Sequence, residues 1–418
     1  MTRASALYLV IVIALVIGVL CSSLIVVAYF YRSEYQKKFR YDRLENNLQS
    51  TINIILVNQD TAFVRAQTFD LYGRGTDSAS IKQMSWGVYM VATAKSFIQS
   101  DTLATTFLIG RGIDSSKWAV LYLKNENRPF SLSGDAMIRG KAYIPNQELN
   151  AISINNEVYK GDKRLVIGSR VKSERSLPLP DTLMLKRISR YLDTTAFPLR
   201  FPNSINHSFL KPTNVFDLKK NVTKLSKLSL RGNVILRSDT VLVIDSTARL
   251  DHAIIFANSI VVERGFKGNC QLFARDSIAI GERCDFRYPS ALGVLRINSS
   301  NTNRGARIRL GEHSTLNGII FIYENKQTEF PAQVALSKRD TINGMIYAPE
   351  ILQVSDGDVL NGCMFTGRFM YSSLGMFYDN YLINTRLDQK GLSPYYLTSG
   401  LFPWASKKRK VLQWLERE

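Results

Sequence analysis

Apolar residues recur at every sixth position through the middle of the chain. Counting every sixth residue from Leu242 and again from Ile244 gives sixteen positions before residue 287, and fifteen of them are apolar. Paired apolar positions two residues apart, repeated with a period of six, predict short strands whose alternate side chains point inward and which each end at a corner. We therefore expect a triangular β-helix, or β-solenoid, over residues 227–385.

A longer repeat agrees with three six-residue faces per coil. Tripeptides that begin with Asp or Asn recur at positions 239, 258 and 276, at intervals of nineteen and then eighteen. Farther along, the phrases STLNGIIFI, TINGMIYAP and DVLNGCMFT each place an aliphatic run after Asn-Gly. Because Asn-Gly accommodates positive φ at a tight corner, these pairs predict stacked corner turns in coils of about 18 residues. The predicted corner residues are Asn317, Gly318, Asn343, Gly344, Asn361 and Gly362.

The aromatic that follows each Asn-Gly, at Phe321, Tyr347 and Phe365, is expected to stack along one face. A related phrase, MIRGKAYIP at 137–145, lies far upstream. It has two interpretations. Either the similarity is accidental, or the solenoid begins before residue 150 and the proline-rich stretch near 178–212 is an insertion within one domain.

The amino-terminal region predicts a membrane anchor. Residues 4–30 carry no charged side chain, and the run is long enough to cross a hydrocarbon core as a helix. We expect residues 1–30 to form a retained transmembrane helix in the bacterial inner (cytoplasmic) membrane, contacting lipid through 4–30. Basic residues after the span favour a cytoplasmic carboxyl side, whereas the short amino tail is typical of a signal anchor that exports the rest of the chain. We favour export.

The next segment, 31–60, predicts an amphipathic stalk helix. It contains neither proline nor glycine, and Leu44, Leu48, Ile52 and Ile55 follow one another at spacings of four, four and three. These spacings place the four side chains on one helical face, so the helix is expected to continue directly from the membrane span.

The remaining segments are assigned by their strand and turn patterns. Residues 61–190 predict a β-rich domain with one helix near 84–100. Residues 191–226 predict a linker or insertion because prolines cluster there. Residues 386–418 predict a cap over the open end of the solenoid, with a basic helix after residue 406. The fold class is therefore mainly β behind an amino-terminal helix.

Net charge and cysteine content indicate which partners, metal sites and disulfides to expect. Lys and Arg outnumber acidic residues by 54 to 35, giving a net charge of +19 that favours anionic partners without choosing among them. A basic cluster near the carboxyl end consists of Lys407, Lys408, Arg409 and Lys410. It belongs either to a solvated cap helix or to a contact with anionic lipid or another polyanion. No specific nucleic-acid partner is indicated. The four cysteines lack metal-ligand spacing, and small buried thiols are expected for Cys270 and Cys284 rather than a disulfide.

Candidate catalytic residues are few. His252 or His313 resembles the single general base of hexapeptide-repeat acyltransferases, but the aliphatic-glycine hexads of those repeats occur here only occasionally. The aspartates of the solenoid are spread along it, whereas β-helical carbohydrate enzymes need clustered carboxylates. We therefore expect a non-enzymatic protein without catalytic residues, cofactor or metal.

Two family resemblances suggest a function. The membrane helix that runs into an amphipathic stalk, together with the distal phrases around residues 317, 343 and 361, resembles pilin-like, pilus-assembly-associated membrane proteins. The six-residue apolar register resembles the core of bactofilins. The first resemblance implies a minor pilin-like, surface-appendage or secretion-machine subunit of the cell envelope with protein partners or self-association. The alternatives are a cytoplasm-facing bactofilin-like scaffold and an envelope polysaccharide-binding protein or β-helical carbohydrate-active enzyme.

Overall fold

The structure is a computed structural model. It describes residues 2–418 except 59–64, 74, 76, 146–148, 155–156, 194–201, 219–221, 298–304, 327 and 374–375. The chain divides into two compact units, which are described separately. The first contains Met1–Gln83, Ala92–Thr105 and Arg417–Glu418, and the second contains Met84–Val91 and Thr106–Glu416.

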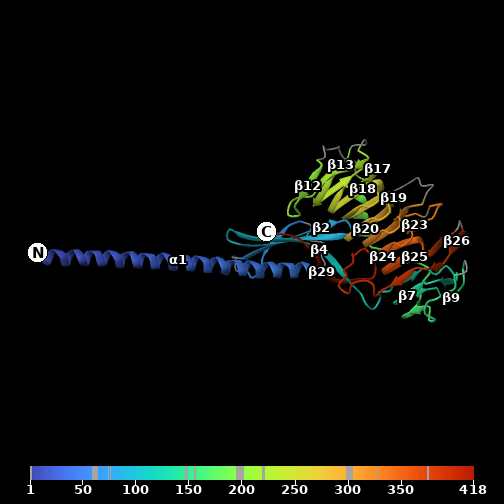
Figure 1. Cartoon of the computed structure of the whole chain (residues 1–418), viewed down its shortest axis with the longest axis horizontal. Coiled ribbons are helices and arrows are strands. Elements are labelled where there is room, and N and C mark those ends of the chain that lie inside the picture. Colours follow the sequence, from blue (N-terminus) through green and yellow to red (C-terminus); the bar gives the residue numbers. More distant parts are fainter. Residues whose placement is uncertain are drawn as a thin grey trace. The chain divides into compact units, whose positions relative to one another are not determined.

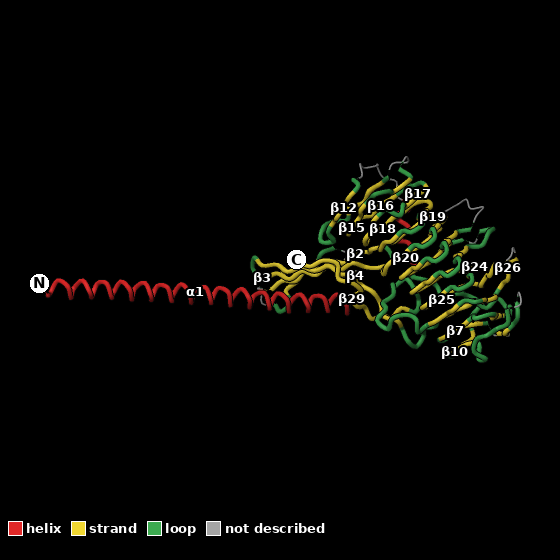
Figure 2. The backbone as a smooth tube through the Cα atoms, viewed as in Figure 1, coloured by secondary structure: helices red, strands yellow, loops and turns green. Residues whose placement is uncertain are grey.

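The first unit is built on the long helix α1 (Thr2–Val57), drawn in red in Figure 2. Its large apolar side chains between residues 7 and 30 are exposed, and its most apolar stretch reaches a mean hydropathy of 3.2, sufficient for a membrane span. The expected continuation of the helix is observed in the described residues, since α1 runs on without a break to Val57. Its predicted apolar face is buried, with relative exposures of 3% or less at Leu44, Leu48, Ile52 and Ile55.

Polar contacts also connect α1 to strands of the same unit. Asp77 is 1% exposed and accepts hydrogen bonds from Arg43 Nε at 2.7 Å and Asn47 Nδ2 at 3.1 Å. Arg40 pairs with Asp101 at 3.0 Å. Two donors on one carboxylate oxygen offset part of the cost of burying the carboxylate. These contacts fix the carboxyl-terminal half of α1 while its apolar half stays uncovered.

A five-stranded sheet has the order β1-β2-β3-β4-β29. The helix predicted near residues 84–100 is wrong, because β2 and β3 cover that stretch and are joined by the two-residue turn at Gly87, whose φ is +58°. In-out alternation of burial along both strands shows the period of two that outweighed helical propensity. The strands are β1 (Gln67–Asp70), β2 (Asp77–Trp86), β3 (Tyr89–Ile98), β4 (Asp101–Ile113) and β29 (Ala405–Arg417).

The basic helix predicted after residue 406 is also wrong, since that segment is strand β29. Strand β29 is hydrogen-bonded to β4 in the five-stranded sheet. In the second unit, reciprocal backbone bonds of 2.8 Å join Arg111 to Thr398, which precedes β29 in the chain. In the first unit, reciprocal bonds of 2.8 and 2.9 Å join Ala104 to Glu418. The edge of a neighbouring strand offers backbone hydrogen-bond partners along the whole segment. These hydrogen bonds outweigh the helix propensity of a short charged stretch.

The second unit is dominated by a large parallel sheet whose strands stack side by side from β12 to β25 (Figure 1). Val241 pairs with Ser259 and Ser259 with Ser277, an interval of eighteen each time. Thr315 pairs with Thr341, an interval of twenty-six, and Thr341 pairs with Val359 after a further eighteen. The arrangement is solenoid-like, and the longer interval places additional loop residues between strands.

This sheet contains, in chain order, β5 (Leu121–Leu123), β7 (Met137–Arg139), β8 (Ala142–Ile144), β10 (Val166–Ile167), β11 (Arg170–Lys172), β12 (Ser204–His207), β13 (Asn214–Asp217), β14 (Lys224–Leu225), β15 (Ser229–Gly232), β16 (Val234–Arg237), β17 (Val241–Ile244), β18 (Arg249–Val262), β19 (Lys267–Ile280), β20 (Asp285–Arg296), β21 (Arg307–Arg309), β22 (Thr315–Glu324), β23 (Gln333–Ala335), β24 (Thr341–Val354), β25 (Val359–Ser373), β26 (Met376–Asp379) and β28 (Arg386–Asp388). A three-stranded sheet contains β27 (Tyr381–Ile383), β6 (Phe130–Ser133) and β9 (Leu149–Ala151).

The upstream phrase at 137–145 belongs to the same large sheet. Strand β5 pairs with β25, and β7 pairs with β28 in the register Met137↔Arg386 and Arg139↔Asp388. Strands between residues 121 and 172 therefore extend the stack beyond its carboxyl-terminal coil. The boundary predicted at residue 190 does not separate two sheets, because parallel pairing joins strands that lie far apart in the sequence.

The linker or insertion predicted at 191–226 is likewise wrong where the structure describes it. Strands β12, β13 and β14 pair in parallel with β15, β16 and β17, so this stretch forms strands of the stack despite its prolines. Just before it, helix α2 (Thr182–Asp193) begins where Asp181 Oδ1 accepts from the backbone N of Leu183 and Met184 at 2.9 and 3.1 Å. Such capping satisfies the first free N–H groups of the helix.

All fifteen apolar residues of the six-residue register are buried, with exposures of 4% or less. Most belong to the core cluster inside the stack. Ile254 and Phe256 instead belong to a second apolar cluster that includes α2 residues, because a register shift at His252 exchanges the faces of the strand after it. Cys270 and Cys284 are free, buried thiols, as expected.

An aromatic ladder runs through the second cluster. Phe321 lies in register with Tyr347, and Tyr347 with Phe365. Tyr347 and Phe365 have ring centroids 5.9 Å apart, and Phe365 lies 6.2 Å from Tyr122 of the appended strands. Neighbouring parallel strands place like positions about 4.8 Å apart, so aromatics at equivalent positions lie next to one another. The three aromatics are therefore aligned along one face, and the expected ring contact is present between Tyr347 and Phe365.

Candidate functional site

One corner of the parallel stack forms a continuous column of polar residues. In the distal coils, Asn317 pairs in register with Asn343, and Asn343 with Asn361. The column continues through Asp388 to Arg139, so the arginine of MIRGKAYIP occupies the position of the asparagine in TINGMIYAP. We call these aligned positions the polar column.

The glycine after each asparagine is required by close backbone approach. Gly318, Gly344 and Gly362 have φ of +151°, +150° and +133°. A Cβ added to Gly344 would lie 1.9 Å from the carbonyl oxygen of Gly318, and one added to Gly362 would lie equally close to Gly344. The Asn-Gly pairs act as bends inside long strands. Glycine is required there because a side chain at that position would prevent adjacent coils from pairing.

The distal asparagines hydrogen-bond one another. Asn343 Nδ2 donates to Asn317 Oδ1 at 2.8 Å, and Asn361 Nδ2 donates to Asn343 Oδ1 at 2.8 Å. Asn317 Nδ2 donates to the carbonyl of Phe286 at 3.1 Å. This part of the column is a self-satisfied amide ladder, so its role is structural.

The upstream part of the same column differs in composition. Asn206 pairs in register with Arg231, Arg231 with Asp251, and Asp251 with Asn269. Arg287 follows Phe286, which pairs with Gly268 in one neighbouring strand and Leu316 in the other. Successive coils therefore present amide, cation, carboxylate, amide and cation along one line.

These upstream residues line a cleft of about 520 Å³, which we call the column cleft. Its opposite wall is the end of β29, including Gln413, Trp414 and Glu416. Glu416 accepts hydrogen bonds from Ser208 Oγ and from Phe209 N. Trp414 is 54% exposed, and its ring lies 5.4 Å from that of Phe107 in an edge-on arrangement. A volume of this size is typical of small-molecule sites.

Asp251 and His252 form a hydrogen-bonded pair at the centre of the cleft. Asp251 Oδ1 lies 2.8 Å from His252 Nδ1, and Asp251 Oδ2 lies 3.4 Å from Arg231 Nε. The hydrogen bond from His252, then its charge and those of the arginines, lowers the pKa of Asp251 against the effect of burial. The carboxylate is therefore ionised and engaged on both oxygens.

The outer ring nitrogen of His252 also has partners. Nε2 lies 3.1 Å from Gln413 Oε1 and 3.4 Å from Asn269 Nδ2. With Nδ1–H donated to Asp251, a neutral imidazole accepts from the Asn269 amide and a protonated one donates to Gln413. The protonated side chain therefore connects the column to Gln413 of β29, and the neutral one connects Asp251 to Asn269 within the column.

His252 occupies a backbone position that favours glycine. Its φ is +61°, and the corresponding residue of the preceding coil is Gly232, with φ +87°. Holding a non-glycine residue in this conformation costs about 1–2 kcal/mol. The carbonyl of His252 accepts from Trp86 Nε1 at 3.0 Å within the same unit.

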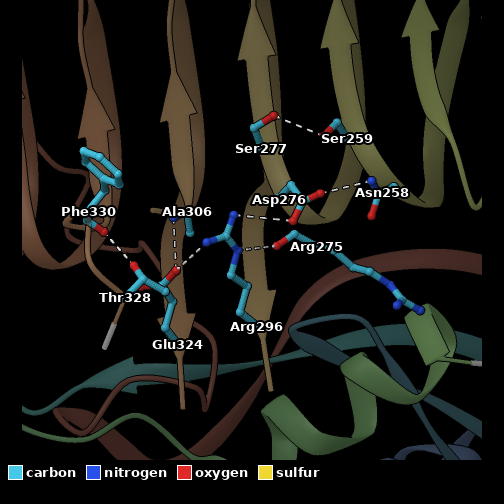
Figure 3. A network of polar contacts seen from close by, with 10 residues as sticks. All are labelled: Asn258, Ser259, Arg275, Asp276, Ser277, Arg296, Ala306, Glu324, Thr328 and Phe330. Carbon is cyan, nitrogen blue, oxygen red and sulfur yellow. Dashed lines mark hydrogen bonds and ion pairs between the residues drawn. The ribbon is translucent and has the colours of Figure 1, made fainter. Parts of the chain in front are cut away.

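A second polar network lies at another edge of the stack (Figure 3). The Arg296 side chain is 6% exposed and contacts Glu324 Oε1 at 3.2 Å, Asp276 Oδ1 at 3.4 Å and the carbonyl of Arg275 at 3.2 Å. Glu324, also 6% exposed, accepts from the backbone N of Ala306 at 3.0 Å. Burial raises the pKa of Glu324 despite these contacts. Because its groups satisfy one another across strands, we regard it as structural.

Two buried aspartates repeat along a further column. Asp340 accepts from Ser314 N at 2.9 Å and Ser337 N at 2.8 Å. Asp358 accepts from Asp340 N at 3.0 Å and Ser355 N at 2.7 Å. Desolvation raises the pKa of Asp340 to about 7 and that of Asp358 to about 8. Their backbone bonds identify them as turn-forming residues.

The other sequence candidates are dispersed. His313 lies at a turn with φ +60°, and its N donates to Lys338 O at 3.1 Å. Lys407 to Lys410 lie on strand β29, where alternate side chains point to opposite faces, so the four cations do not form one patch. Burial, with the nearby Arg111 charge, lowers the pKa of Arg409. Within the described residues, no group of three or more His, Cys, Asp and Glu is arranged to hold a metal ion.

Sequence reasoning overlooked Arg231, Arg287 and Trp414 as site residues. The two arginines do not repeat a phrase, and the tryptophan lies after a basic run that suggested a cap helix. A common signal was nevertheless present for the arginines. Each stands at or near the corner position that Asn-Gly occupies in distal coils, and aligning the coils by their corners would have placed them in one column.

Comparisons with known proteins yield a weak structural likeness. No family model matches the sequence, and a search of curated proteins finds no match. Among solved structures, the competence-associated pilin ComZ from Thermus thermophilus is similar at a TM-score of 0.28 and 10% identity, with 85% of this chain and 86% of that chain covered. A likeness at this TM-score supports no argument about fold or function.

Proposed function

We propose that this chain is a non-enzymatic, pilin-like component of a cell-envelope assembly. Residues 4–30 anchor it in the bacterial inner membrane, and the bulk of the chain lies outside the cytoplasm. The observation that carries the proposal is helix α1. Its first half presents exposed apolar side chains, whereas its second half buries Leu44, Leu48, Ile52 and Ile55 in the first unit. Such a division suits a subunit whose apolar half-helix passes from lipid to neighbouring subunits.

We propose that the region attached to the membrane by this anchor is a triangular β-helix with coils of about 18 residues. Equal register intervals between Val241, Ser259 and Ser277 support it, as does the burial of most of the six-residue register inside the stack. Coils stacked by backbone hydrogen bonds give a stiff body that resists mechanical load along the envelope. The two alternatives, a cytoplasm-facing scaffold and a carbohydrate-active enzyme, differ from this proposal in orientation and in chemistry.

Membrane orientation is tested by fusing a reporter enzyme that is active only outside the cytoplasm to the carboxyl end of the full chain. Activity equal to that of an exported control supports the proposal. Activity only from a cytoplasm-specific reporter in the matched fusion contradicts it and favours the scaffold. Because Glu418 N and O pair with Ala104, the reporter is joined through a flexible linker.

Assembly is tested through Cys21, the exposed cysteine of α1. The other three cysteines are buried, so oxidative cross-linking in intact membranes reports on this position. We expect a disulfide-linked dimer, or a cross-link to a partner subunit, that is lost in Cys21→Ser. A chain that stays monomeric while the reporter shows correct export would contradict the assembly role and leave only the anchor.

A further inference from the structure

The column cleft is donor-rich, which indicates the chemistry of its occupant. Its two carboxylates are engaged, Asp251 by His252 and Arg231, and Glu416 by Ser208 and Phe209. Donors remain in excess around them, because a guanidinium carries five N–H groups and each amide carries two. The Arg231 side chain is 69% exposed, and Arg287 is exposed as well. A ligand that enters this cleft must therefore supply acceptors.

The contrast with the distal column makes this excess meaningful. There, the same corner position is filled by asparagines that hydrogen-bond one another at 2.8 Å. In the cleft, two arginines and an aspartate take the place of that amide ladder. The side chains at the corner therefore no longer satisfy one another through amide–amide hydrogen bonds. It is also here that the glycine position is taken by His252, at the cost of a left-handed backbone. Lost self-pairing at this corner, with hydrogen-bond donors left in excess, points to binding rather than to fold maintenance.

Trp414 adds an exposed aromatic ring to the cleft. It is exposed by 54%, in contrast to Trp86, Trp118 and Trp404, which are exposed by 8% or less. Its ring shares the cleft with cations and amides, so an occupant meets an aromatic face and polar donors together. A sugar ring has this dual character, with C–H groups that pack on an aromatic and hydroxyl groups that accept and donate hydrogen bonds. An added carboxylate would pair with a guanidinium through charge-assisted bonds.

We infer that the column cleft binds an acidic saccharide, with Trp414 under a sugar ring, the Arg287 guanidinium on a carboxylate, and Asn206 and Asn269 on hydroxyl groups. His252 is a positioning residue, because it holds Asp251 on one side and Gln413 of β29 on the other. Residues of the column repeat at the strand spacing of about 4.8 Å, which suits successive polar groups of an extended chain. This site is independent of the anchor and assembly role proposed above.

The inference is tested on the purified full-length chain in detergent with oligogalacturonate as the acidic probe. The uncharged probe is a cello-oligosaccharide of equal length, and the phosphate-bearing probe is a single-stranded oligonucleotide. Titration calorimetry gives affinity, and acrylamide quenching of tryptophan fluorescence gives location, since Trp414 is the exposed tryptophan. We expect binding of the acidic saccharide, protection of Trp414 from quencher, and at least tenfold weaker binding of the uncharged one.

Variants locate the binding. Arg287→Gln is expected to weaken acidic-saccharide binding about tenfold or more, as for loss of a charge-assisted hydrogen bond, and Trp414→Ala to abolish the quenching protection. The matched control is Arg309→Gln, an exposed arginine of β21 outside the cleft, which should leave affinity unchanged. His252→Gly is expected to keep or raise thermal stability, because glycine relieves the backbone, while weakening binding.

Three outcomes would overturn the inference. One is no measurable binding of oligogalacturonate by a folded chain. Another is binding that Arg287→Gln and Arg309→Gln weaken equally, which would mean attraction by net charge alone. The last is tighter cleft-dependent binding of the oligonucleotide, which would assign the site to phosphate-bearing polymers. If His252→Gly instead destabilises the chain, the histidine is a fold element and its positioning role is wrong.

Discussion

Replacing Arg296 with methionine tests how buried charge stabilises the stack. The side chains of Arg296 and Glu324 are each 6% exposed and lie 3.2 Å apart. Methionine keeps the apolar stem but leaves the Glu324 carboxylate buried, with the Ala306 N–H still donating to it. Breaking a buried pair from one side costs about 3–5 kcal/mol, because the remaining charge stays desolvated. We expect Arg296→Met to lower the free energy of unfolding by about this amount at pH 8.

The cost depends on pH with a defined sign. Burial already raises the pKa of Glu324, and Arg296 opposes that rise, so its removal raises the pKa further. The native variant then binds a proton that the unfolded chain releases above its ordinary pKa, and stability falls as pH increases through that interval. The variant should therefore be less destabilised at pH 5 than at pH 8, where Glu324 is forced toward its charged form.

The assay is thermal and urea unfolding of the full-length chain in detergent, followed by circular dichroism at both pH values. The double variant Arg296→Met, Glu324→Leu removes both charges and should recover most of the lost stability. Asp276→Asn is the matched control, because Asp276 is 44% exposed and its pairing with Arg296 should be worth less than about 1 kcal/mol. A single variant that loses under about 1 kcal/mol, shows no pH dependence, or is no less stable than the double variant would refute the reasoning.

Two further perturbations address the repeat itself. Gly344→Ala should destabilise the chain by about 2 kcal/mol or more in a thermal melt, since its Cβ would lie 1.9 Å from Gly318 O. The control Gly112→Ala, whose Cβ would have its nearest atom at 3.8 Å, should cost less than about 1 kcal/mol. Equal losses of stability in the two variants would mean that the corner is not close-packed. Burial raises the pKa of Asp358 to about 8, so the folded state holds a proton that the unfolded state loses near pH 4, and stability should fall from about pH 4 to pH 8. In Asp358→Asn the decline measured by unfolding at pH 5 and pH 8 should be shallower, and an unchanged slope would show that another group titrates.

The long apolar helix, the stalk face and the stacked corners could be predicted because each depends on residues close together in sequence. The uncharged run over 4–30, an apolar face at helical spacing and an apolar period of six are local patterns, and the physical demand behind each is local as well. The fifteen buried positions and the positive φ of Gly318 show how directly those demands were met.

The local repeat was readable from the chain alone, as strands of alternating character, corners that accept positive φ, and one helix long enough to span a membrane. The choice of strand partners was not, because it depends on which edges the folded chain brings together. Arg139 meets Asp388, and residues after 404 form a strand rather than a helix, because an open sheet edge supplies backbone hydrogen bonds that no local pattern records. The column cleft has the same origin, since parallel pairing aligned Arg231, Asp251 and Asn269 from separate coils into one surface.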